Sequence, residues 1–233
     1  VRQSLRNYLV AFTRERARQR WMEEHVDPVR VVAAGTLLDP SAMTIGFARR
    51  FTGYKRPELI FHDPQRLAAI LDAPRRPVQI IFAGKAHPAD DVGKHHLMRV
   101  YQHAVNPVFA GRVGFVDDYD LHVAHFLVQG CDVWLNNPRK PLEASGTSGM
   151  KASINGVVHL SISDGWWAEA HNGHNGWTIE PDVATDDYSA QDAADAEALY
   201  RLLEQQVVPA FYDRDERGLP RKWVRIVKEA IRT

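Results

Sequence analysis

The 233-residue sequence lacks several features that would assign it to a specialised class of protein. It has a single cysteine, Cys131, which excludes both a disulfide framework and a metal site built from several cysteines. No hydrophobic run approaches the roughly 18 residues that a membrane-spanning helix requires, and the first residues show no signal-peptide pattern. We therefore expect a soluble, cytoplasmic protein that binds no membrane.

The sequence also lacks an excess of charge of either sign. Lysine and arginine together number 29, as do aspartate and glutamate, so the formal net charge is zero. This balance argues against a nucleic-acid partner, because duplex binding requires a basic surface. The 45% hydrophobic and 25% charged contents are typical of a folded globular protein and exclude a disordered or collagen-like chain.

Both ends of the sequence lie within helical patterns. The first helix has apolar residues at amphipathic spacing, namely Leu5, Tyr8, Leu9 and Phe12. We predict a leading helix over residues 1–26 whose many arginines face solvent. Residues 223–228 again show a helical pattern. We therefore expect residues 1–233 to form a single domain excised from a larger, two-domain enzyme.

From Ala42 onward, strand-like and helix-like segments alternate. The predicted strands cover residues 42–47, 78–82, 113–116, 131–135 and 157–162. The predicted helices cover residues 57–71, 91–105, 121–128, 145–155 and 190–208, and Pro209 interrupts the last one. This alternation predicts an α/β fold with a mostly parallel sheet and helices on both faces. Ligands of such sheets bind beyond the carboxyl ends of the strands.

The densest polar cluster, residues 141–151 (PLEASGTSGMK), follows a predicted strand and starts a helix. Free backbone N–H groups and the positive end of the helix dipole favour an anion there. The position of Lys151, two residues after Gly149, differs from a nucleotide P-loop, and the G-x-G-x-x-G order is missing. The pattern indicates a phosphorylated cofactor held by a lysine, such as pyridoxal phosphate. An ordinary capped helix fits it equally well.

Two other polar clusters follow predicted strands. Residues 48–56 contain four cations, which suits a phosphate-bearing substrate, although a solvated basic loop has the same composition. Residues 164–177 combine carboxylates, histidines, asparagines and tryptophans, as sugar-binding loops do, but the tryptophans could equally belong to the core. The histidines lack partners at zinc-ligand spacing, so we expect no metal site.

Taken together, these segments resemble the α-glucan phosphorylases, the glycogen and starch phosphorylase family. Residues 143–151 are similar to the cofactor-lysine motif of that family, and Arg50 with Tyr54-Lys55-Arg56 is similar to its substrate-phosphate motif. Three further segments follow in the family's order: Gly84-Lys85-Ala86, Asp117-Asp118-Tyr119 and Asp164-Gly165. The resemblance runs from about residue 45 to residue 177 and is greatest to the shorter prokaryotic branch.

The resemblance implies the GT-B architecture, in which two Rossmann-like domains face each other across a cleft. This chain would be the C-terminal domain, which binds pyridoxal phosphate, and its partner would be the N-terminal domain of the same enzyme. The implied reaction is reversible phosphorolysis, in which inorganic phosphate releases terminal α-1,4-glucosyl units of an α-glucan as glucose 1-phosphate. The full-length protein would be a homodimer, as family members often are, and the isolated fragment would be inactive.

The resemblance further implies a cofactor site. Lys151 would hold pyridoxal phosphate through an imine, and Tyr119 would line the cofactor ring. The cofactor phosphate would be bound by the other four residues of the site: Gly146, Thr147, Ser148 and Arg49.

The implied substrate site adjoins the cofactor. Arg50 and Lys55 would bind the substrate phosphate and, with Lys151, form the catalytic set. The glucosyl hydroxyls would be contacted by Glu143, Ser145 and Gly146. The sequence departs from the animal and plant pattern at Arg49, Thr52-Gly53, Asp120 and Ser148-Gly149.

Two other functions stay open from the residues. A nucleotide-sugar glycosyltransferase of the glycogen-synthase type would use the same cations and helix start for a diphosphate, with no covalent role for Lys151. A non-catalytic glucan-binding module would depend on residues 164–177 and would leave residues 143–151 as simple helix capping.

Overall fold

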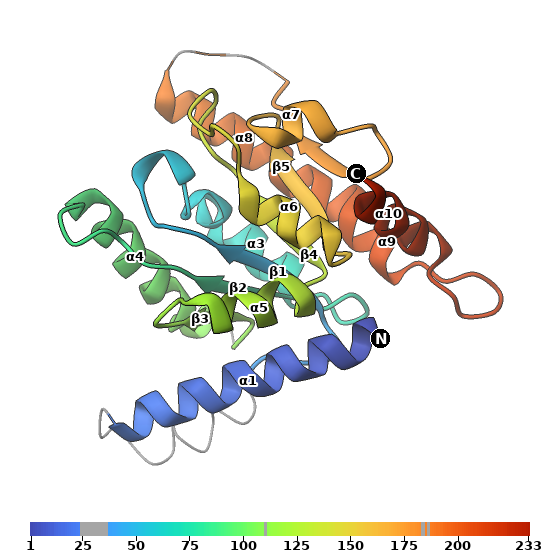
Figure 1. The fold of residues 1–233 in the computed structure, drawn as a ribbon, viewed down its shortest axis with the longest axis horizontal. Coiled ribbons are helices and arrows are strands. Elements are labelled where there is room, and N and C mark those ends of the chain that lie inside the picture. Colours follow the sequence, from blue (N-terminus) through green and yellow to red (C-terminus); the bar gives the residue numbers. More distant parts are fainter. Residues whose placement is uncertain (24–36, 110, 183–184, 186) are drawn as a thin grey trace.

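The computed structural model describes residues 1–23, 37–109, 111–182, 185 and 187–233. Its centre is a six-stranded sheet in which every neighbouring pair of strands is parallel (Figure 1). The strands are β1 (Met43–Ala48), β2 (Val78–Ala83), β3 (Val113–Val116), β4 (Val133–Asn136), β5 (Val158–Ile162) and β6 (Gly176–Ile179). Their order, β3-β2-β1-β4-β5-β6, is that of a doubly wound Rossmann sheet.

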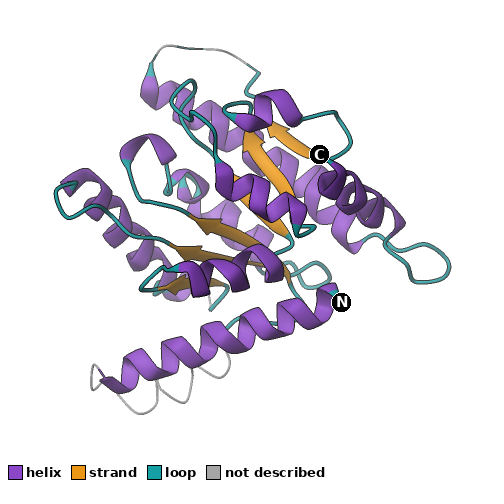
Figure 2. Cartoon of the chain, viewed as in Figure 1, coloured by secondary structure: helices purple, strands orange, loops and turns teal. Residues whose placement is uncertain are grey.

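Helices cover both faces of this sheet (Figure 2). One face carries α1 (Arg2–Glu23), α5 (Leu121–Gly130) and α6 (Thr147–Ile154). The other face carries α3 (Pro64–Leu71), α4 (Asp91–Ala104), α8 (Tyr188–Leu202) and α9 (Val208–Tyr212). Two further helices are α7 (Trp166–Ala170), directly after β5, and α10 (Arg221–Arg232), which packs on α6, α9 and β5. The predicted α/β class is therefore confirmed.

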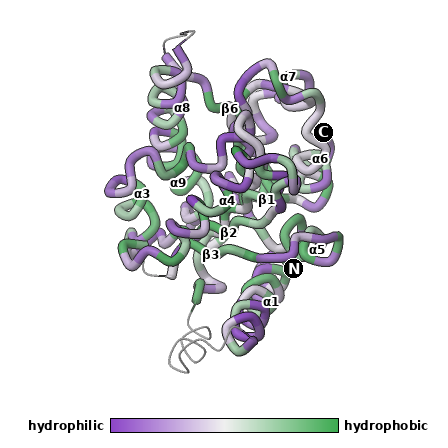
Figure 3. Tube along the Cα trace, turned by 90° about the vertical axis from the view of Figure 1, so that its left-hand side faces the viewer, coloured by the Kyte–Doolittle hydropathy of each residue, from purple (hydrophilic) through white to green (hydrophobic). Residues whose placement is uncertain are grey.

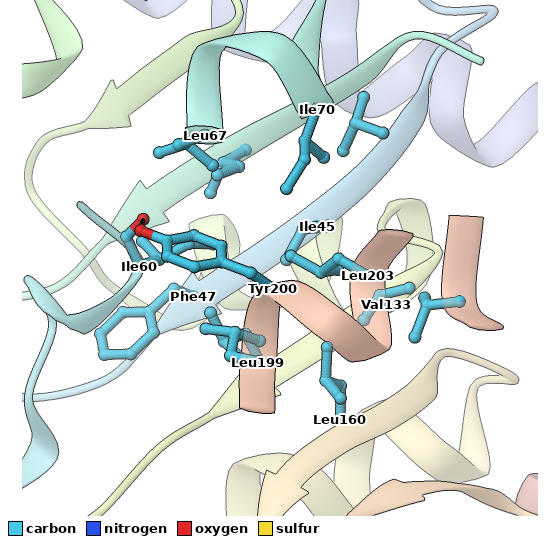
Figure 4. Packing of buried hydrophobic residues seen from close by; sticks show 14 of the residues in the cluster. Ile45, Phe47, Ile60, Leu67, Ile70, Val133, Leu160, Leu199, Tyr200 and Leu203 are labelled. Carbon is cyan, nitrogen blue, oxygen red and sulfur yellow. Dashed lines mark hydrogen bonds between the residues drawn. The ribbon is translucent and has the colours of Figure 1, made fainter. Parts of the chain in front are cut away.

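The core has two hydrophobic clusters, one on each side of the sheet. Every residue of β1 and β2 is buried, and alternate side chains enter different clusters. Ile45 and Phe47 pack against α3 and α8 in the larger cluster (Figure 4), whereas Ala48 packs toward α1 and α5. Figure 3 shows hydrophobic residues along the central strands and hydrophilic residues on outer turns of α1 and α8. Within the described ranges, no helix is both long and apolar enough to cross a lipid bilayer.

The helix predicted over residues 57–71 begins later, at Pro64. Residues 59–61 form a 3₁₀ turn with all three side chains buried. Asp63 then caps α3 by accepting a hydrogen bond from the Arg66 amide at 2.9 Å, and Pro64 occupies the first turn. Pro57 also fits the first turn of a helix, so the sequence pattern alone placed the helix start at Pro57 instead of Pro64.

Pro209 does not interrupt the helix that precedes it, contrary to the prediction. A π-helical segment, Leu203–Val207, joins α8 directly to α9. Proline lacks the N–H group that an α-helix would use, and the wider π turn shifts the hydrogen-bond register just before it.

The segment predicted as a polar loop over residues 164–177 contains α7 and the start of the unpredicted strand β6. Its three tryptophans are buried, as the core alternative required, and so offer no exposed ring face to a sugar. Trp167 Nε1 donates a hydrogen bond to Thr178 Oγ1 at 3.1 Å, and Trp177 Nε1 donates one to the Gln206 side chain at 3.0 Å.

Helix α1 differs from the predicted solvated basic helix. Arg6 is buried and forms an ion pair with Asp132 at 2.6 Å, while Arg14 donates to the carbonyl oxygens of residues 37 and 38. Arg16 donates to the Asp117 carbonyl oxygen at 3.1 Å. These arginines therefore attach the helix to the sheet. Residues 24–26 of the predicted helix lie outside the described residues.

Candidate active site

The strand order changes direction at one point, between β1 and β4. These strands are paired through Ile45 with Val133 and Gly46 with Trp134, and the chain continues from them toward opposite edges of the sheet. The connections that leave their carboxyl ends therefore separate and form a crevice, which is where ligands of doubly wound sheets bind.

A cleft of about 670 Å³ opens at this point. All ten residues singled out from the sequence line it: Arg49, Arg50, Lys55, Tyr119, Glu143, Ser145, Gly146, Thr147, Ser148 and Lys151. They come from the connections after β1, β3 and β4 and from the start of α6. The fold thus brings together residues that are up to 102 positions apart in the sequence.

Three cations from the connection after β1 reach the cleft. Arg49 is buried, donates to the Leu135 carbonyl oxygen at 2.8 Å and lies over the Phe47 ring. Burial lowers the pKa of its guanidinium group to about 10, which leaves it a cation at neutral pH. Arg50 is exposed at the rim, and Lys55 is largely buried.

Glu143 is the buried acidic side chain among these cations. Its Oε2 accepts a hydrogen bond from the Lys55 ammonium group and lies 4.0 Å from Arg49 Nη1. Its backbone N–H group donates to Asp164 Oδ2 at 2.9 Å. The carboxylate is therefore held inside the positive region and neutralises only part of it.

The start of α6 presents unpaired backbone donors. Gly146, with a φ of 81°, caps the helix without any side-chain hydrogen bond. The five consecutive N–H groups of residues 144–148 have no acceptor within the described part of the chain. Unpaired amides at a helix start form a site for an anion. Lys151, one turn further along α6, is exposed, and its ammonium group has no polar partner among the described residues.

Beneath this helix start lies an unusually close packing of large rings. Gly149 sits against His159 and Trp166, and a Cβ atom at position 149 would lie 2.5 Å from His159 Cε1. The His159 ring contacts both Trp166 and Trp167, at centroid distances of 5.2 and 4.7 Å, and these two rings also contact each other at 5.4 Å. This contact accounts for glycine at position 149, one of the departures from the animal and plant pattern.

The cleft also has an apolar wall that sequence reasoning missed. It is formed by one face of α5, through Leu121, Ala124 and Val128. Leu121 is 87% exposed, which is unusual for a leucine and leaves its side chain available to a ligand. Leu121, Ala124 and Val128 are spaced three and four residues apart, as on any helix face that packs on a core. The sequence pattern therefore gave no indication of a binding site.

Two residues in or beside the candidate motifs have structural roles, although Asp120 also lines the cleft. Arg56 turns away from the cleft, where it forms ion pairs with Asp192 and Asp195 of α8 at 2.8 and 2.7 Å. Asp120 caps α5 by accepting a hydrogen bond from the Val123 amide at 2.8 Å. The basic loop thus supplies three cations to the cleft rather than four.

Comparison with known proteins identifies the family of the chain. The family model described as carbohydrate phosphorylase matches residues 14–173. The chain belongs to the carbohydrate phosphorylase family. It is 55% identical to glycogen phosphorylase of Aquifex aeolicus (strain VF5) over 228 residues, which cover 97% of this chain and 32% of that protein. It is 47% identical over 233 residues to glycogen phosphorylase of Mycobacterium tuberculosis (strain H37Rv), covering all of this chain and 27% of that protein.

This member of the phosphorylase family therefore spans about a third or less of the length of those relatives. Among solved structures, it is similar to the catalytic domain of starch synthase IV from Arabidopsis thaliana bound to ADP and acarbose. The TM-score is 0.59 at 18% identity, over 88% of this chain and 38% of that one. The chain has the Rossmann-like fold of one half of a GT-B glycosyltransferase.

Proposed function

We propose that this chain is the cofactor-binding, C-terminal part of a cytoplasmic α-glucan phosphorylase. The enzyme would cleave terminal α-1,4-glucosyl units with inorganic phosphate and release glucose 1-phosphate. The observation that carries the proposal is that one cleft unites Lys151, the unpaired amides of residues 145–148 and three cations. The missing N-terminal domain would supply the facing wall, and the full-length protein would form a homodimer.

The cleft has the groups that pyridoxal phosphate requires. The unpaired amides at the start of α6 and the buried Arg49 cation suit the cofactor phosphate, and Arg49 Nε is itself buried without a partner among the described residues. Tyr119 and Leu121 offer a largely apolar surface for a ring. Lys151 would attach the cofactor covalently. When bound, pyridoxal phosphate supplies a phosphate group that exchanges protons with the substrate phosphate.

The chain's own residues would bind and orient the substrate. Arg50 and Lys55 would attract inorganic phosphate and lower the repulsion between two adjacent phosphates. Glu143, held by Lys55, would accept hydrogen bonds from glucosyl hydroxyls, and the backbone N–H groups of Ser145 and Gly146 would donate hydrogen bonds to them. The apolar face of α5 would exclude water from one side of the cleft.

Covalent trapping tests the cofactor site. The protein is incubated with pyridoxal phosphate and reduced with borohydride, and the modified lysine is mapped by peptide mass spectrometry. We expect one adduct, at Lys151, which K151A loses. The matched control K140A, which removes an exposed lysine from the same connection, retains the adduct.

If the 233-residue chain is labelled at scattered lysines, the same incubation and reduction are repeated on the full-length protein. An unlabelled Lys151 there contradicts the proposal and favours a nucleotide-sugar glycosyltransferase, which has no covalent role for that lysine. Phosphate-independent glucan binding without any adduct would instead favour a binding module.

A further inference from the structure

The connection from β5 to the start of α7 contacts the segment that carries Glu143. Residues 164–166, here called the rear corner, pack against residues 143–145. None of the rear corner's three residues lines the cleft. Its contacts are nevertheless made to the segment that carries the acidic side chain and the first of the unpaired amides.

Asp164 makes the first of these contacts. Its side chain is buried, and its two carboxylate oxygens accept two different amide hydrogens. Oδ2 accepts from Glu143 N–H at 2.9 Å, and Oδ1 accepts from Gly165 N–H at 3.0 Å. One carboxylate therefore fixes the rear corner and residue 143 to each other. A hydrogen bond of this charge-assisted kind is stronger than a neutral one.

Gly165 and Trp166 make the second and third contacts. The backbone of Gly165 has a φ of 55° and a ψ of −141°, which other residues rarely adopt. A Cβ atom at this position would lie 2.6 Å from the Ser145 carbonyl oxygen. That same oxygen accepts a hydrogen bond from the Trp166 amide at 2.8 Å. No residue with a Cβ atom fits at position 165 between the rear corner and residues 143–145.

These contacts occupy the Glu143 amide and the Ser145 carbonyl group, and they leave the amides of residues 144–148 unpaired on the described chain. We propose that Asp164 is a positioning residue that sets the location of the Glu143 carboxylate and of the backbone at Ser145, the part of this segment that would contact glucosyl hydroxyls. Resting on the proposed function, this inference assigns the rear corner to glucosyl recognition. It gives the rear corner no part in attaching the cofactor at Lys151, which lies further along α6.

The test uses the full-length enzyme that contains this chain, loaded with pyridoxal phosphate. D164A removes both acceptors. In D164N the side-chain oxygen can accept a hydrogen bond from only one of the Glu143 and Gly165 N–H groups, and the new NH₂ group faces the other. We expect KM for glucose 1-phosphate to rise at least about tenfold in D164A and less in D164N. Cofactor content, measured by absorbance, should stay at the wild-type level in both.

G165A is an independent variant, because it disturbs the same contact through the Ser145 carbonyl oxygen. It should raise KM as D164A does. The control is D63A, which removes another carboxylate that accepts a backbone N–H group, at the start of α3 and outside the cleft lining. D63A should leave KM unchanged. Wild-type KM values in folded, cofactor-loaded D164A and G165A would overturn the inference.

Failure of the proposed function would look different. A wild-type enzyme without phosphorolysis overturns that function, and the rear corner can then be tested by hydrogen exchange at the Glu143 amide. Exchange should be at least about tenfold faster in D164A than in D63A, since only D164A removes the acceptor of that amide. Equal exchange in the two variants would overturn the positioning role as well.

Discussion

His159 is the residue with the most unusual surroundings in the described chain. Its ring is fully buried beneath the start of α6, and neither ring nitrogen has a partner among the described residues. Burial lowers the pKa of this histidine to about 3. An unfolded chain would titrate it near its ordinary value of about 6.5. The native protein therefore keeps the ring neutral where the unfolded chain already binds a proton.

This difference predicts a pH dependence of stability. Between pH 6.5 and 3 the unfolded state binds more protons at position 159, so the free energy of unfolding falls as the pH falls through this range. From pH 7 to pH 5 the contribution of His159 should fall by about 2 kcal/mol. Urea unfolding at both pH values checks this. In H159N the loss between the two pH values should be smaller by that amount, and an unchanged loss would contradict the assignment.

The candidate site residues could be predicted because their signal is local. Residues 143–151 combine small residues, a helix start and a lysine in one short segment, and six of them line the same cleft as Arg49, Arg50, Lys55 and Tyr119. Asp164 could not be given its contact with the Glu143 amide from the sequence, because that contact joins residues 21 positions apart. The apolar wall on α5 was likewise hidden within an ordinary helical pattern.

At the scale of elements, a buried ion pair is one of the contacts that attach α1 to the sheet. Arg6 donates to both carboxylate oxygens of Asp132, at 2.7 and 2.6 Å, and Asp132 also accepts from the Thr44 amide of β1. The helix packs closely on α5, where a Cβ atom on Gly130 would lie 2.4 Å from Leu9 Cβ. The ion pair thus connects α1 to the strands on either side of the switch in strand order.

Removing one partner should therefore be costly. D132A leaves a buried, unpaired guanidinium group and should lower the free energy of unfolding by about 3–5 kcal/mol. The matched control is E204A, which breaks an ion pair with the partly exposed Arg66 and should cost under about 1 kcal/mol. Chemical denaturation measures both. Equal effects in the two variants would mean that Asp132 does not anchor the helix.

The elements that sequence reasoning placed correctly are those with a strong period or a continuous apolar run, such as β2 and α4. The errors have physical causes. Pro57 and Pro64 both fit the first turn of a helix, so the sequence pattern did not identify Pro64 as the start of α3. The π turn before Pro209 has no recognisable pattern in the sequence. Strand β6 is short and contains one of the tryptophans that had been considered for sugar binding.

At the scale of the whole molecule, the chain spans about a third or less of the length of the relatives it matches, and the proposed function places a domain facing the cleft in the remainder. We predict that the 233-residue chain alone releases no glucose 1-phosphate from an α-glucan and phosphate, because half of the wall around the substrate would be missing. The full-length protein should release it, and its K151A variant should not. The measurement is glucose 1-phosphate formation under identical conditions. Phosphorolysis by the isolated chain would contradict the need for a facing domain.

The pairing of β1 with β4 has a consequence for refolding. These strands share only two register positions, whereas β1 and β2 share six. Lys55 and Glu143, which meet across this junction, are separated by 88 positions, so a long loop must close before they meet. Contacts of such high sequence separation form slowly. In a refolding experiment, phosphate binding should therefore appear only after each half of the sheet has formed. The time at which binding appears would then report when β1 pairs with β4 and joins the two halves.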